Sequence, residues 1–246
     1  MANKHKYKTG TYGNIKLHVI ETDASNIKLV NLAGGKSIGG STYFGVNGGW
    51  FDLQKGLLNV TVCDGYVVAD SGSNNNGVGG GVIGWDGSQA LCLTGTNNID
   101  AIRGAVMGVA KNGTWAQGGF SLWLGDSQWK TKLDKEVNGD DQVNIVYSSH
   151  PGRTALVAKN GGDVRLFVTR ETVGVEKFRD AIQAYLGIKN GTATEWKGIL
   201  LDGSYSSQLK AKNDSNATVT IEDPDKSWGT SYPRRIYGIV ALRDNS

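Results

Sequence analysis

Three short stretches of the sequence place side chains that bind anions or activate water next to glycine, each at the end of an apolar run. They are FGVNGGWFD (residues 44–52), HPGRTALVA (150–158) and ILLDGSYSS (199–207). An arginine fork suits a phosphate or a carboxylate, and hydroxyls and main-chain N–H groups after a strand can complete an anion site. Together the three stretches predict one cleft that binds an anionic small molecule beside a carboxylate.

Each stretch alone also has a structural interpretation. Asn47 before two glycines fits a turn, and Asp202 before a glycine fits a turn that the aspartate caps. Arg153 alone fits a cation on the surface. The functional interpretation depends on the combination, and it predicts that Asn47, Arg153, Asp202 and Ser206 line one cleft.

Several common catalytic motifs are absent or out of context. GGGVIG (79–84) matches the dinucleotide pattern G-x-G-x-x-G, but a turn and a strand follow it where a dinucleotide site needs a helix. LAGGKS lacks the first glycine of a phosphate-binding loop, because Val30 stands there. His5, His18 and His150 are too few and too scattered for a three-histidine zinc site, and neither G-x-S-x-G nor H-E-x-x-H occurs. We therefore expect neither a metal nor a cofactor.

The composition is that of a soluble globular protein with an unusual share of glycine. Of 246 residues, 39% are hydrophobic and 20% are charged, and 36 are glycine, about double the usual share of roughly 7%. With only 3 prolines, we expect these glycines in turns and bulges of β structure. A net charge of +3 gives no basis for a nucleic-acid partner and permits an anionic small substrate.

The chain carries no sign of a membrane or secretory segment. No stretch of about 18 apolar residues occurs, and the basic start is not followed by an apolar segment, so we expect no membrane partner and a cytoplasmic location. Cys63 and Cys92 lie in separate apolar runs, which favours buried free thiols over a zinc site or a disulfide framework. The sequence leaves the oligomeric state open.

Short apolar runs separated by turn residues predict a β-rich fold. Asp-Gly at 64–65, Asp-Gly at 86–87 and Asn-Gly-Gly at 160–162 each separate two such runs, which is typical of antiparallel hairpins. The polar stretch SGSNNNGVGGG (71–81) fits either a lid over a site or a disordered loop.

One segment, near residues 174–187, has a helical period instead. Glu171 or Thr172 is its expected start, and Gly187 is its expected left-handed cap. An apolar run before it and another after it predict a strand–helix–strand crossover. The sequence thus predicts an α+β fold, a single domain over 1–246 that is mainly antiparallel β-sheet with one principal helix.

In this order, with the predicted helix between the second and the third, the three stretches resemble the motifs of the phosphodiester glycosidase family. VNGGWF, GRTAL and LDGSYSS are similar to that family's Asn-Gly-Gly-aromatic-Phe, Gly-Arg-Thr-Ala and Leu-Asp-Gly-Gly-Gly-Ser-Ser. The resemblance covers about residues 44–207 and the closing RRIYGIVAL (234–242). The short chain without a leader is similar to bacterial or bacteriophage proteins.

The resemblance implies a hydrolase that splits the bond between a sugar's anomeric carbon and a phosphate, in a sugar 1-phosphodiester or a related nucleotide sugar. The leaving phosphomonoester has a second pKa near 6, so the reaction needs a cation and a carboxylate more than a strong acid. Arg153 is the implied cation, Asp202 the carboxylate with Asp52 as its alternative, and His150 an additional acid or phosphate ligand. The other residues expected to bind the substrate are Asn47, Gly48, Thr154, Gly203, Tyr205, Ser206 and Ser207.

Two positions depart from the family pattern. Ser204 and Tyr205 stand where the family usually has glycines, so the tyrosine would reshape the pocket or stack on a sugar or a base. The alternative function is therefore a non-catalytic binding protein, such as a phage-encoded sponge for a sugar phosphate or a cyclic nucleotide immune signal. A third alternative is a phage particle component that grips cell-wall glycan phosphates.

Overall fold

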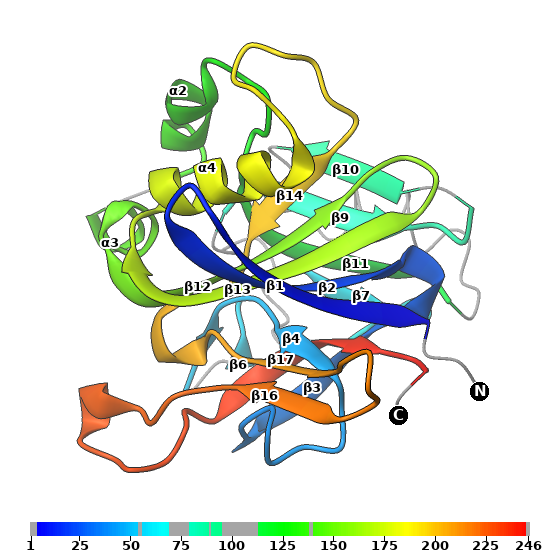
Figure 1. The fold of residues 1–246 in the computed structure, drawn as a ribbon, viewed down its shortest axis with the longest axis vertical. Coiled ribbons are helices and arrows are strands. Elements are labelled where there is room, and N and C mark those ends of the chain that lie inside the picture. The colour runs from blue at the N-terminus through cyan, green and yellow to red at the C-terminus, as the bar shows by residue number, and fades with distance from the viewer. Residues whose placement is uncertain are drawn as a thin grey trace.

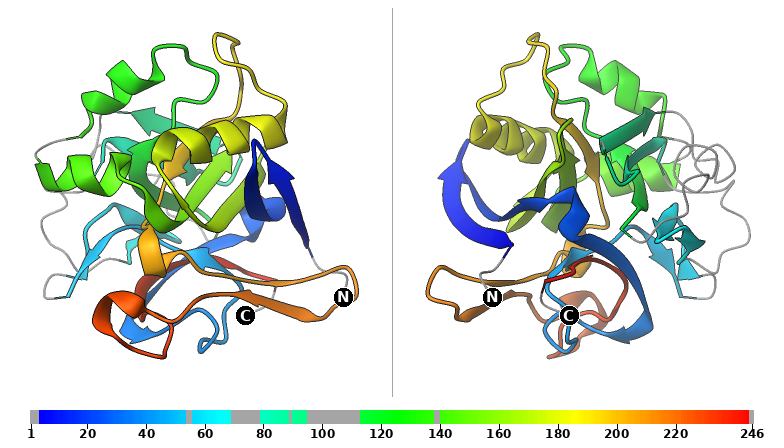
Figure 2. Two further views of the ribbon diagram at one scale, coloured as in Figure 1. Left: turned by 60° about the vertical axis from the view of Figure 1, so that its left-hand side comes forward. Right: turned by 90° about the vertical axis from the view of Figure 1, so that its right-hand side faces the viewer.

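Two antiparallel sheets stack beneath a layer of helices in the computed structural model (Figure 1). The structure describes residues 4–53, 56–68, 79–88, 90–94, 113–137 and 140–244. The views of Figure 2 show the same three layers from the side, with the helices on one face of the large sheet and the small sheet on the other. This arrangement makes the large sheet the central layer.

The large sheet has ten strands in the order β1-β2-β13-β12-β14-β11-β7-β8, with β9 paired to β11 and β10 paired to β9. Its strands are β1 (His5–Tyr12), β2 (Ile15–Asp23), β7 (Thr61–Cys63), β8 (Tyr66–Val67), β9 (Gly81–Trp85), β10 (Ala90–Thr94), β11 (Trp115–Ser121), β12 (His150–Ala158), β13 (Asp163–Val173) and β14 (Lys197–Leu200). The hairpins β7–β8, β9–β10 and β12–β13 are antiparallel and confirm the three that the turn residues predict.

The small sheet has five strands in the order β16-β15-β4-β17-β3. Its strands are β3 (Ile27–Lys36), β4 (Gly45–Asn47), β15 (Leu209–Lys212), β16 (Thr218–Ile221) and β17 (Ile236–Leu242), and a separate pair is formed by β5 (Phe51–Asp52) and β6 (Gly56–Leu57). The helices are α2 (Trp129–Asp134), α3 (Asp140–Tyr147) and α4 (Val175–Leu186), with short 3-10 turns η1 (Ala24–Asn26), η4 (Ser204–Ser206) and η5 (Lys226–Trp228).

The large sheet is buried on both faces, because successive side chains of a strand point to opposite sides. In β12, Ala155 and Val157 belong to the core under the helices. Leu156 and Ala158, in alternation with them, belong to the core between the two sheets. This explains why the central strands are continuous apolar runs with no polar face.

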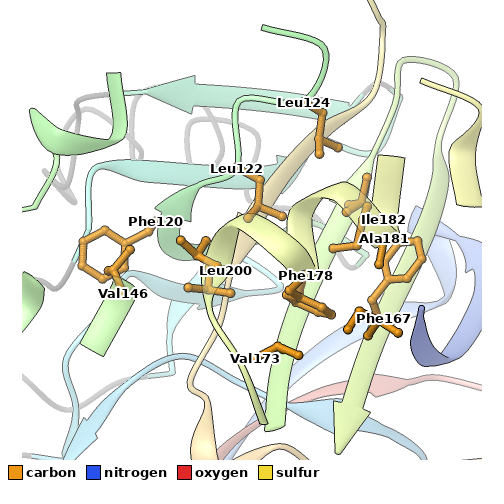
Figure 3. Packing of buried hydrophobic residues seen from close by; sticks show 14 of the residues in the cluster. Phe120, Leu122, Leu124, Val146, Phe167, Val173, Phe178, Ala181, Ile182 and Leu200 are labelled. Atoms are coloured by element: carbon orange, nitrogen blue, oxygen red, sulfur yellow. The ribbon is translucent and has the colours of Figure 1, made fainter. Parts of the chain in front are cut away.

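The principal helix is α4, and it confirms the helix predicted near 174–187. Its Phe178, Ala181 and Ile182 point onto β13, where Phe167 and Val173 meet them (Figure 3). β13 and β14 both pair antiparallel with β12, so they run parallel to each other and α4 makes the predicted crossover between them.

Gly187 is the left-handed cap of α4, as predicted, with φ 70°. The expected start at Glu171 or Thr172 is wrong, because both residues continue β13 and the helix begins after Gly174. The short helices α2 and α3 were not predicted. The segment of α3 is only eight residues long and its apolar residues are bunched at 143–147, so no helical period stands out.

The prediction of an α+β, mainly antiparallel fold is confirmed. Cys63 is a free thiol but only half-buried, while the Cys92 side chain and residues 71–78 of the polar loop lie outside the described residues. In the part of the chain that the structure describes, no helix has both the length and the apolar character of a membrane span.

Candidate active site

The three stretches meet where the chain passes from the large sheet to the small one (Figure 1, orange). This connection is residues 201–208, between β14 and β15, and it includes η4. Leu201 donates its N–H to Thr154 O (2.9 Å), and Asp202 donates its N–H to Gly48 O (3.2 Å). The main chain alone therefore ties the third stretch to the other two.

The Asn47 side chain strengthens this junction. Its Oδ1 accepts from Thr154 Oγ1 (2.7 Å) and from the main-chain N–H of Gln208 (3.1 Å), and its Nδ2 donates to Asp202 O (2.8 Å) and to Gly48 O (3.3 Å). The side chain is buried. These bonds use both lone pairs and both N–H groups of the amide, so the amide has no hydrogen bond left for a ligand.

The Arg153 guanidinium is buried against the end of α3. Nε donates to Val173 O (3.1 Å), Nη1 to Ile145 O (2.8 Å), and Nη2 to Val146 O (3.0 Å) and to the carbonyl of Ser148. The last carbonyls of a helix lack partners within it and favour a nearby cation. Four of the five N–H groups are therefore engaged with main-chain carbonyls, and a phosphate could reach only one.

The Asp202 carboxyl is half-buried beside a cavity. Burial raises its pKa from 3.8 to about 6, and this effect outweighs the Ser206 hydroxyl, the Arg234 guanidinium, the N–H of Gly203 and the Arg153 guanidinium, which all lower it. The Gly203 N–H donates to Oδ1 at 2.9 Å. Asp202 therefore caps its turn and also presents a carboxyl with a perturbed pKa, a combination common at reactive sites.

Two hydroxyls and two glycines lie directly beneath this turn. The hydroxyls of Ser206 and Ser207 are buried and make no hydrogen bond of normal geometry with any described residue. A Cβ on Gly152, which has φ +112°, would lie 2.9 Å from Ser207 Cβ, and one on Gly48 would lie 3.0 Å from the main chain of Gly238. These glycines are needed because segments approach closely.

The other candidate residues lie around this junction. His150 Nε2 is 3.0 Å from Asn144 O of α3, and His150 is not among the residues that line the cavity. Asp52 is half-buried in β5, whose other residue does line the cavity. The Tyr205 ring lies 5.8 Å from the Arg234 guanidinium.

The cavity beside Asp202 has a volume of about 690 Å³. It is lined by Phe51 of the first stretch, by Leu53, which follows that stretch, and by Tyr237 of β17. It is also lined by residues of the segment 223–235, which we call the wall segment and which contributes two arginines and a tyrosine. Asp202 is the one residue of the third motif that reaches the cavity surface in the described part of the chain.

Asp225 fixes the shape of the wall segment. It is 2% exposed, and its Oδ2 accepts from Arg234 Nε at 2.7 Å while its Oδ1 accepts from the N–H of Ser227 at 3.0 Å. Its main chain bonds to Tyr232 O (2.8 Å) and to the N–H of Thr230 (3.2 Å). The sequence analysis missed this wall, and the only signal for it is the arginine pair that precedes the last apolar run.

Ser204, which replaces a glycine of the family motif, has a left-handed main chain with φ 58°. This conformation costs an L-residue roughly 1–2 kcal/mol. Glycine would relieve that cost, but it also makes the unfolded chain more flexible, which offsets part of the gain in stability. We expect Ser204→Gly to raise the free energy of unfolding by about 0.5–1 kcal/mol, measured by urea denaturation. Ser25→Gly is the control, since Ser25 is exposed and has no positive φ; it should lower stability. Equal effects of the two changes would contradict the prediction.

Within the described residues, no three or more histidine, cysteine, aspartate or glutamate side chains come together as metal ligands would. The groups at the cavity that could hold an anion are the arginines of the wall segment, Arg234 and Arg235, whereas the Ser206 and Ser207 hydroxyls are fully buried and do not line it.

The sequence matches no family model and no curated protein. Its fold is similar to that of a solved structure, the catalytic domain of zebrafish N-acetylglucosamine-1-phosphodiester alpha-N-acetylglucosaminidase, auto-inhibited by its pro-peptide. The TM-score is 0.64, with 98% of this chain and 84% of that chain covered, and the two are 15% identical. At this identity the similarity concerns the architecture. The chain shares its fold with a phosphodiester glycosidase catalytic domain.

Proposed function

We propose that this chain is a hydrolase that cleaves the bond between a sugar's anomeric carbon and a phosphate oxygen in a sugar 1-phosphodiester. The observation that carries the proposal is Asp202, a carboxyl with a pKa raised to about 6 in the wall of the cavity. A general base works best when its pKa lies near the working pH. The shared fold supports the same reaction class by analogy.

The proposed reaction needs one proton transfer and one leaving group. As a water oxygen bonds to the anomeric carbon, Asp202 takes a proton from that water. The bond between the anomeric carbon and the phosphate oxygen breaks, and its electron pair leaves with a phosphomonoester, which needs little protonation because its second pKa is near 6.

We assign the cation of this reaction to the wall segment. Arg234 is near enough to Asp202 to lower the pKa of that carboxyl, and it lines the cavity together with Arg235. A fixed cation stabilises the charge that develops on a departing phosphate. Arg153, which is engaged with α3, then has an indirect role: its charge lowers the pKa of Asp202, and its side chain packs beside Gly203 of the turn.

The pKa of Asp202 leads to a pH dependence. The base must be ionised, so kcat/KM should rise with pH, reach half of its maximum near pH 6 and become level about one unit higher. A phosphodiester has no ionisation in this range, so the transition belongs to the enzyme. Rates measured from pH 4.5 to 8 on the protein and on His150→Gln should show the same rise, because His150 does not line the cavity. A rise that is lost in His150→Gln would assign the transition to the histidine.

The direct test is product formation. The full chain is incubated with hexose and N-acetylhexosamine 1-phosphodiesters, and free sugar and phosphomonoester are followed by mass spectrometry. Stoichiometric release of both supports the proposal. Release of an alcohol with the sugar 1-phosphate intact would indicate cleavage at the wrong bond and overturn it.

A second candidate is binding without cleavage, as in a sponge for a sugar phosphate or a cyclic nucleotide. The observation that favours it is the turn itself, where Ser204 and Tyr205 replace glycines next to Asp202 and the Tyr205 ring packs near Arg234. Tight binding followed by recovery of the intact ligand, in a protein with Asp202 unchanged, would support this candidate.

A further inference from the structure

The cavity has more apolar surface at its rim than a sugar and one phosphate require. Four large hydrophobic side chains are exposed among the described residues, and two of them line this cavity: Leu53 is 61% exposed and Tyr232 is 78% exposed. Exposed apolar groups that gather at one place mark a binding surface. Leu53 and Tyr232 come from separate segments and share this rim.

An ordered aromatic pair also lines this cavity. Phe51 and Tyr237 are stacked, with ring centroids 4.7 Å apart and an interplanar angle of 23°. The Tyr237 hydroxyl donates to Leu53 O at 3.2 Å. Gly34 gives room to the Tyr237 ring, because a Cβ there would lie 2.6 Å from it. The rings are therefore held in place before a ligand arrives, which limits the entropy lost on binding.

Positive charge lines the same cavity. Arg235 lines the cavity, is exposed, and makes no hydrogen bond or ion pair within the described part of the chain. Arg234 is neutralised in part by Asp225. An unengaged guanidinium beside aromatic rings suits a ligand that joins a phosphate to a flat ring.

We propose that the leaving-group side of the cavity binds a nucleoside phosphate, with the phosphate at Arg235 and Arg234 and the base against Tyr232 and the Phe51–Tyr237 pair. The lining also contains polar side chains, so the choice of a base over a second sugar rests on the three aromatic rings of Phe51, Tyr232 and Tyr237. The volume of about 690 Å³ lies within the range of roughly 300–1,000 Å³ that holds larger small molecules.

This inference rests on the proposed function for the position of the site, and its test is binding and not turnover. Calorimetry on the full chain at pH 7 and constant salt compares adenosine 5′-monophosphate with α-glucose 1-phosphate. Both are phosphomonoesters, and only the first has a base. Stacking of one base on aromatic side chains contributes about 1–3 kcal/mol, so we expect the nucleotide to bind roughly tenfold more tightly.

Two variants separate the base from the phosphate. Tyr232→Ala should weaken adenosine monophosphate about tenfold and leave glucose 1-phosphate unchanged, because it removes a stacking surface. Arg235→Ala should weaken both ligands by the same factor. Tyr66→Ala is the matched control, since Tyr66 is also 78% exposed but does not line the cavity, and it should change neither affinity.

Equal affinity for the two ligands, or equal effects of Tyr232→Ala and Tyr66→Ala, would overturn the inference. Its failure can be told from failure of the proposed function. Nucleotide preference without hydrolysis of any phosphodiester rejects the hydrolase and keeps the nucleoside phosphate site. Hydrolysis of a simple sugar phosphodiester without nucleotide preference keeps the hydrolase and rejects the nucleoside phosphate site.

Discussion

Asp202→Asn should leave ligand affinity nearly unchanged and lower turnover at least about a hundredfold, the lower end of what one general acid–base group contributes. Asparagine keeps the size of the side chain and an oxygen that can accept the Gly203 N–H, now at 2.9 Å. It cannot take a proton from water. Affinity is measured by calorimetry with α-glucose 1-phosphate, and turnover by release of phosphomonoester from a sugar phosphodiester.

Asp52→Asn is the control for this result, because Asp52 is a half-buried carboxylate near the cavity that does not line it. We expect its turnover to stay within about twofold of the unchanged protein, since less than 1 kcal/mol is involved. If Asp202→Asn keeps full turnover, Asp202 only caps its turn, where asparagine serves almost equally well. A large loss in Asp52→Asn would then assign the chemistry to that residue.

Arg153→Ala should destabilise the protein by about 3 kcal/mol or more, even in the absence of any ligand. Truncation leaves four carbonyls, one from β13 and three at the end of α3, without the guanidinium that now bonds to them. A buried polar group without a partner costs about 1–3 kcal/mol. The measurement is the free energy of unfolding from urea denaturation, followed by circular dichroism.

Arg235→Ala is the matched control, because Arg235 is exposed and such surface changes usually stay within about 0.5 kcal/mol. We thus expect Arg153→Ala to lower stability, and Arg235→Ala to lower phosphate affinity with little effect on stability. An Arg153→Ala protein of normal stability that no longer binds glucose 1-phosphate would show that Arg153 is the phosphate clamp after all.

The elements that depend on local pattern could be predicted from the sequence. The helical period of α4 and its Gly187 cap are local signals, as are the turn residues of the three hairpins. The start of α4 could not be predicted, since β13 extends to Val173 through its pairing with β12. That pairing joins distant parts of the chain, and a local window contains no information about it.

The motifs identified the junction between the sheets but could not give the role of each side chain. The sequence suggests that Arg153 is a phosphate ligand, because most of the carbonyls that engage it lie at the end of α3, a helix that the sequence did not predict. No pattern of residue spacing in the sequence predicts the conformation of the wall segment. Its shape depends on the buried pair of Asp225 and Arg234, which only the folded chain brings together at 2.7 Å.

The wall segment and the Asp202 turn differ in how they are bonded to the two sheets, and this difference affects how easily each can change during evolution. The turn is bonded into both sheets through Asn47 and Thr154, so a change there disturbs the whole molecule. The wall segment is held by its own bonds around Asp225 and lies outside the named strands. Its links to the rest of the molecule include the ion pair of Asp223 with Arg170 and the bond from Gln208 Nε2 to Arg234 O. We therefore expect residues of the wall segment outside these bonds, such as Tyr232 and Arg235, to vary more easily among descendants of this chain than the turn does. Ligand preference could then diverge while Asp202 is inherited unchanged.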